Sequence, residues 1–95
     1  MKLSKNINKY MTFWRGEFAD NYKNLPRLYN ALVENNVLFD EKDDCLSVTF
    51  FVKHSIHKQW IEVNHYDGFV EKLLDFTDCR FVELNIVPED DFPDV

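Results

Sequence analysis

Glycine, proline and cysteine are all scarce in this chain of 95 residues, which has two, three and two of them. So few glycines leave no phosphate-binding loop, because such loops need several glycines whose backbone amides approach the phosphate closely. No apolar run comes near the roughly 20 residues that span a bilayer, so no membrane segment is expected. The charged N-terminus is not followed by the apolar stretch of a signal peptide, and we expect a cytoplasmic protein.

The residues that commonly bind metals or act as nucleophiles do not form a motif. Cys45 and Cys79 lack the paired spacing of zinc or redox sites, and each begins a predicted strand, where free cysteine usually behaves as a small apolar side chain. The sequence leaves a disulfide between them open, although a cytosolic setting disfavours it. The histidines His54, His57 and His65 match no zinc-binding spacing. We therefore predict no metal, no cofactor, no catalytic residue and no enzymatic activity.

Acidic residues outnumber basic ones, and the net charge is −6. Much of the excess falls in residues 40–44, predicted to form a turn, and in residues 89–95, predicted to be an acidic tail after a single domain of residues 1–88. Nucleic acids are bound mainly through contacts of Lys and Arg with phosphates, so tight binding of nucleic acid is not expected. A protein partner fits this charge better.

The hydrophobic pattern predicts a helix, a helix, a strand, a strand, a broken helix and a strand. The predicted helices cover residues 7–22, 26–34 and 55–77, the last one broken at residues 64–65. The predicted strands cover residues 37–39, 45–52 and 80–87, with a five-residue loop in the first hairpin. We expect a small α+β domain with a three-stranded sheet and helices packed on one face of it.

Several side chains are expected to point inward. The strand over residues 45–52 alternates and places one set of apolar residues toward the core: Leu46, Val48, Phe50 and Val52. The last strand and the helix before it add a second set: Val82, Leu84, Ile86, Ile56, Trp60 and Ile61. Ser55 is the expected N-cap of that helix. Gly16 weakens the first helix by about 1 kcal/mol relative to alanine. A glycine inside a helix indicates close packing against a neighbour, so we expect such packing here.

The first helix carries a stripe of aromatic residues larger than a three-stranded sheet is expected to bury. We therefore hypothesise a partner-binding surface made of the outward aromatic and basic residues of the first two helices: Trp14, Tyr22, Arg27 and Tyr29. Packing in the core is the other interpretation of Trp14 and Trp60, since both lie on apolar stripes of helices. Tryptophan and tyrosine are nevertheless enriched at the energetic centres of interfaces.

Five segments resemble a known family of replication domains: Leu25–Leu32, Leu46–Val52, Ile56–Glu62, Phe69–Leu74 and Phe81–Val87. Over about residues 7–87 the chain resembles the C-terminal domain of the gamma/tau clamp-loader subunit of bacterial DNA polymerase III. It is also similar to the related N-terminal domain of the replication initiator DnaA. The chain has neither the P-loop nor the zinc site of a clamp loader, so it is either a stand-alone relative or a fragment.

The resemblance implies a KH-like α+β fold and docking to a polymerase, a helicase or another replication protein. No binding residue is transferred from the family. The alternative function is a KH-like module that binds nucleic acid, but such modules clamp the backbone through a GXXG loop. Gly16 and Gly68 are isolated, so this chain has no such loop.

Overall fold

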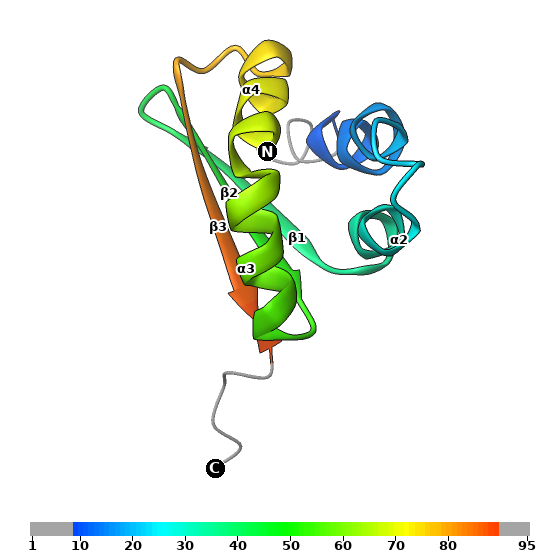
Figure 1. The fold of residues 1–95 in the computed structure, drawn as a ribbon. Helices are drawn as coiled ribbons and strands as arrows, with labels where there is room; N and C mark the ends of the chain where they lie inside the picture. Colours follow the sequence, from blue (N-terminus) through cyan, green and yellow to red (C-terminus); the bar gives the residue numbers. More distant parts are fainter. Residues whose placement is uncertain (1–8, 90–95) are drawn as a thin grey trace. The chain divides into compact units, whose positions relative to one another are not determined.

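The computed structural model describes residues 9–89, which belong to two compact units, Met1–Asn35 and Asn36–Val95. The predicted fold class is confirmed, because helices accompany a three-stranded mixed sheet in the expected order (Figure 1). The predicted start of the first helix at residue 7 lies outside the described residues, as does all of the predicted acidic tail except Glu89. No helix within residues 9–89 combines the length and the apolar character that a membrane span requires.

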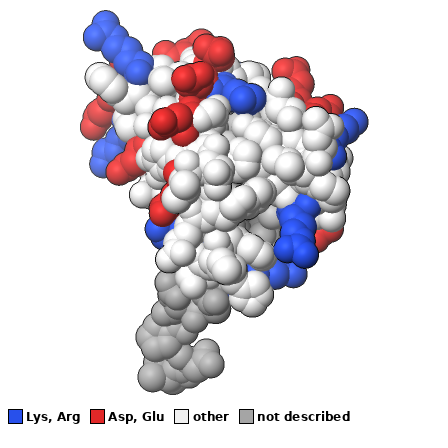
Figure 2. Space-filling model, in the orientation of Figure 1, with Lys and Arg blue, Asp and Glu red and all other residues white. Residues whose placement is uncertain are grey.

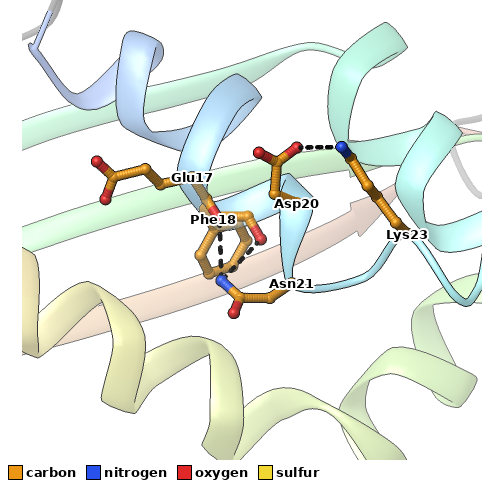
Figure 3. Close-up of polar contacts among 5 residues, drawn as sticks. All are labelled: Glu17, Phe18, Asp20, Asn21 and Lys23. Atoms are coloured by element: carbon orange, nitrogen blue, oxygen red, sulfur yellow. Dashed lines mark hydrogen bonds and ion pairs between the residues drawn. The ribbon is translucent and has the colours of Figure 1, made fainter.

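In the first unit, residues 9–20 are helical and contain a π-helical segment, η1 (Trp14–Phe18). The helix ends two residues earlier than predicted, because the side-chain amide of Asn21 donates hydrogen bonds to the carbonyl oxygens of Glu17 (2.9 Å) and Phe18 (3.3 Å) (Figure 3). These carbonyls belong to the last turn of the helix, where regular helical partners run out, and the Phe18 carbonyl also accepts a 3.2 Å hydrogen bond from the backbone amide of Asn21. An exposed ion pair of Lys23 with Asp20, 3.6 Å long, follows.

The second helix of this unit is α2 (Pro26–Glu34). It begins at its proline as predicted, since the first turn of a helix has no use for the amide hydrogen that proline lacks. The close packing expected at Gly16 is wrong: a Cβ atom built there meets no atom within 4 Å. The glycine therefore weakens its helix without making room for a neighbour.

In the second unit the strands are β1 (Val37–Lys42), β2 (Cys45–Val52) and β3 (Phe81–Pro88). The central strand β2 pairs antiparallel with β1 and parallel with β3. The predicted inward residues of β2, spaced two apart, are all buried, and so are Leu84 and Ile86 of β3. Val82 is only half-buried. The other face of β2 is half-exposed.

The five-residue hairpin loop predicted from the sequence is wrong. Lys42 pairs with Cys45, so the loop contains only Asp43 and Asp44, with φ angles of 53° and 65°. Positive φ at both loop residues is typical of the tight turn whose twist matches that of a hairpin, and aspartate tolerates this conformation better than most side chains. The acidic run therefore continues β1 instead of interrupting it.

Asp44 also holds the start of β3. Its carbonyl oxygen accepts hydrogen bonds from the backbone amides of Arg80 (3.1 Å) and Phe81 (3.2 Å). Its carboxylate accepts another from the Arg80 amide (3.2 Å) and lies 3.3 Å from the Arg80 guanidinium. The first pair of the parallel ladder, Cys45 with Phe81, follows directly.

Two helices connect β2 to β3: α3 (Ser55–Asn64) and α4 (Tyr66–Phe76). The break predicted at residues 64–65 is confirmed, since His65 lies between them with φ −131° and ψ −7°. Ser55 is the first helical residue and not the N-cap, a position that His54 takes. Both helices pack against β3, and Figure 1 shows them running along the sheet.

Replacing Gly16 tests whether this position tolerates a side chain. Gly16→Ala is expected to raise the free energy of unfolding by about 0.5–1 kcal/mol, because alanine loses less backbone entropy in a helix and meets no obstacle here. Urea unfolding followed by circular dichroism measures the change. A lower free energy of unfolding would mean that the π-helical segment requires glycine.

Candidate functional site

The four residues predicted to bind a partner do not form one exposed surface. Trp14 is 0% exposed, its ring stacks on Phe18 with centroids 4.6 Å apart, and its indole Nε1 donates a 3.0 Å hydrogen bond to the carbonyl oxygen of Leu32. Leu32 lies in the last turn of α2, where carbonyl oxygens lack helical partners. Trp14 thus joins the two helices of the first unit and completes the end of one of them.

The other three predicted residues differ in exposure. Tyr22 is buried with its ring 5.8 Å from that of Phe18, Arg27 is exposed, and Tyr29 is half-buried. The expectation of outward side chains is therefore wrong for Trp14 and Tyr22. Arg27 and Tyr29 are two residues apart on α2 and do not share a helix face. Binding of a partner by these residues stays a prediction.

Large apolar side chains are exposed on α3 instead. Ile56 is 69% exposed, Trp60 38% and Val63 80%, and their spacing of four and three residues aligns them on one face of the helix. We call these three residues the α3 stripe. Their predicted burial is wrong for Ile56 and Trp60, and Val63 was not predicted at all. Its spacing of three from Trp60 is the sequence signal that places it on this face.

Only Ile61 among the predicted inward residues of α3 is buried, with 1% of its surface exposed. Each residue turns the helix by about 100°, so Ile61 and Trp60 cannot both face the same layer. The helix has one face for the sheet and a second apolar face for solvent. Packing in the core of this unit therefore does not explain why the second face is apolar.

The borders of the α3 stripe are polar but uncharged. Gln59 and Asn64 lie beside it, and the side-chain amide of Asn64 donates a 2.9 Å hydrogen bond to the carbonyl oxygen of Trp60. The nearest charged side chains on α3, Lys58 and Glu62, pair with each other at 2.6 Å. A ligand of this face would therefore meet apolar groups and amides, and no unpaired charge of α3.

Exposed acidic residues follow one face of α4 at intervals of four: Asp67, Glu71 and Asp75. Figure 2 shows acidic side chains over α4 and over the hairpin end of the sheet. This charge repels phosphates.

His65 packs between two aromatic rings at the junction of α3 and α4. Its imidazole lies edge-on to the ring of Trp60, with centroids 5.0 Å apart, and 6.3 Å from the ring of Phe69. Burial, and then the nearby charge of Lys72, lower the pKa of His65 from its ordinary value of 6.5. The imidazole therefore contacts Trp60, the central residue of the α3 stripe, and its environment disfavours the protonated form.

The other histidines and the two cysteines do not form a site within the described residues. The rings of His54 and His57 meet edge to face at 5.4 Å, and no three metal-binding side chains within residues 9–89 are grouped to hold an ion. Cys45 and Cys79 are both free thiols. The Cys79 thiol lies 3.5 Å from the carboxylate of Glu41, and burial is the main cause that raises its pKa. A raised pKa lowers the thiolate fraction on which nucleophilic attack depends.

The two tryptophans allow a matched test of core and surface. Trp14→Phe is expected to lower the free energy of unfolding by about 1–3 kcal/mol, because it leaves the Leu32 carbonyl without its donor. Trp60→Phe is expected to change it by less than about 0.5 kcal/mol, as substitutions at exposed sites usually do. Urea unfolding of both variants measures the difference, and equal losses would contradict these placements.

The lowered pKa of His65 predicts a pH dependence of stability. The unfolded chain takes up the proton at a higher pH than the folded protein does, so acidification below about pH 6.5 favours unfolding. We expect the free energy of unfolding to fall between about pH 7 and pH 5.5, and His65→Gln to reduce that fall. Urea unfolding at a series of pH values measures both curves. An unchanged slope in the variant would show that another group causes the dependence.

Comparisons of the chain with protein-family models, with curated proteins and with solved structures find no match. The resemblance to clamp-loader and initiator domains therefore stays a prediction from the sequence. What the chain does is inferred from its own residues.

Proposed function

We propose that this chain is a protein-interaction domain without enzymatic activity, and that the α3 stripe is its docking surface. The exposure of Ile56, Trp60 and Val63 in one line carries the proposal. Scattered apolar residues on a surface are ordinary, whereas contiguous ones often mark an interaction site. Tryptophan at the centre of such a line is the residue type most often found at energetic hot spots.

The size and chemistry of the α3 stripe favour a short partner segment. A standard interface between folded proteins involves about 20–30 residues on each side, whereas this surface offers three apolar side chains and two uncharged neighbours. An amphipathic helix matches it, because its own apolar residues repeat at three and four positions and can lie along α3. The uncharged borders favour a partner face that is also uncharged.

The sequence resemblance supports a partner from the replication machinery, namely a replicative polymerase, a helicase or a protein that acts with them. A role in binding nucleic acid has less support, since the acidic face of α4 opposes phosphates. Titration with single-stranded DNA and RNA at low and moderate salt distinguishes the two functions. Tight binding that weakens steeply with salt would favour the nucleic-acid role.

Substitutions in the α3 stripe test the docking surface. We expect the folded protein to bind the replicative helicase or polymerase of its own organism, and Trp60→Ala or Val63→Glu to weaken that binding about tenfold or more, which corresponds to about 1.4 kcal/mol. Leu38→Glu is the matched control, because Leu38 is 60% exposed on β1, outside the α3 stripe. Isothermal titration calorimetry measures the affinity of the wild type and of the three variants for the partner.

Two results would contradict the proposal in different ways. Unchanged affinity in folded Trp60→Ala and Val63→Glu would remove the α3 stripe from consideration. Absence of binding to both replication proteins would overturn the choice of partner. Binding through this uncharged surface is also expected to depend little on salt.

A further inference from the structure

The two edges of the sheet differ in charge. β1 carries Asp40, Glu41 and Lys42 among its six residues, whereas β3 has one charged residue, Glu83, among eight. Charged side chains on an edge strand discourage pairing with another chain. Within the described residues no strand pairs with the outer side of β3. The β3 edge is thus the long, weakly charged one, and its outward residue Phe81 is 62% exposed.

Some backbone amides and carbonyls of β3 point away from β2, toward the unpaired edge of the sheet. The Phe81 amide donates toward β2, to the carbonyl oxygen of Asp44 at 3.2 Å. Backbone groups alternate in direction along a strand, so the amides and carbonyls of Val82, Leu84 and Ile86 point away from β2. The hydroxyl of Tyr66 donates to the Leu84 carbonyl at 3.2 Å, and that oxygen keeps a second lone pair.

The sequence of β3 complements itself when two copies run antiparallel about a two-fold axis at Leu84. Across this axis the opposite residues are Phe81 and Val87, Val82 and Ile86, Glu83 and Asn85, and Leu84 and Leu84. The carboxylate of each Glu83 then faces the amide of Asn85, which can donate to it. The residues whose backbone groups point outward also face one another, as a hydrogen-bonded antiparallel ladder requires.

Neighbouring registers are less favourable. A shift by two residues in one direction places Glu83 opposite Glu83, and like charges directly opposite destabilise a strand pair. A shift in the other direction places Val82 opposite Pro88, which has no amide hydrogen to donate. The register centred on Leu84 avoids both faults.

We propose that two copies of this chain pair through their β3 edges in this register and form a six-stranded sheet across a two-fold axis. The contact is the same patch on both copies, as a two-fold dimer requires. It uses a different surface from the α3 stripe and does not depend on the function proposed above. Each copy carries a net charge of −6, so salt strengthens the dimer by screening the repulsion between the copies.

Opposite charges placed at one exposed position test the register. In the dimer each residue 85 faces Glu83 of the other copy, so Asn85→Lys is expected to strengthen association about threefold or more and Asn85→Glu to weaken it by a similar factor. Sedimentation equilibrium at about 0.15 M salt, where charges are screened over about 8 Å, measures the dissociation constants. Gln59→Lys and Gln59→Glu make the same changes of net charge on exposed α3 and are the matched controls.

A second measurement tests the ladder directly. When the wild-type concentration is raised toward about 1 mM, where even weak association is detected, we expect hydrogen exchange to slow at the amides of Val82, Leu84 and Ile86. The proposal is overturned if the wild type remains monomeric at that concentration. It is also overturned if the dissociation constants of the Asn85 variants change no more than those of the Gln59 controls. Loss of association in Val63→Glu alone would overturn it too, because the copies would then meet through α3.

Discussion

The second unit depends on β2, which among the described strands is the one paired on both sides. Its alternate residues Leu46, Val48, Phe50 and Val52 are completely or almost completely buried, and its ladder holds β1 on one side and β3 on the other. A parallel neighbour has to be reached through a crossover connection, usually helical. The pairing of β2 with β3 therefore also dictates where α3 and α4 lie, and the α3 stripe is a consequence of that placement.

Asp44 shows how a charged loop residue supports this arrangement. Acidic residues in an exposed turn usually need no explanation beyond solubility. Asp44 does more, because it binds the first amides of β3 and the side chain of Arg80. Its surface ion pair contributes little by itself, since exposed pairs are worth about 0–1 kcal/mol. The larger effect is geometric, because the carbonyl and the carboxylate set the residue at which the parallel ladder begins.

Much of the fold follows from periodicity in the sequence. The alternation in β2 predicts its buried face, and the interrupted pattern at residues 64–65 predicts the break between α3 and α4. The hairpin loop is shorter than predicted because consecutive aspartates have the composition of a loop, while the two-residue turn depends on φ angles that composition does not reveal. The pairing of Lys42 with Cys45 selects the two-residue turn over the five-residue loop.

The candidate site was harder to predict, because Trp14 and Trp60 both lie on apolar helical stripes. What distinguishes them is the partner of each ring: Trp14 donates to the end of α2, whereas Trp60 shares its helix with Ile61, which occupies the face toward the core. Both facts arise from contacts between elements. Periodicity identifies which side chains share a face, but it does not identify which face another element covers.

The two-residue turn has a consequence for the order in which the chain folds. The hairpin of β1 and β2 joins residues close in sequence, and hairpins form in about 1–10 μs, whereas Cys45 and Phe81 must meet across 36 positions. Local pairs form before distant ones because closing a longer loop loses more entropy. During synthesis on the ribosome, β2 therefore has an open edge until β3 emerges.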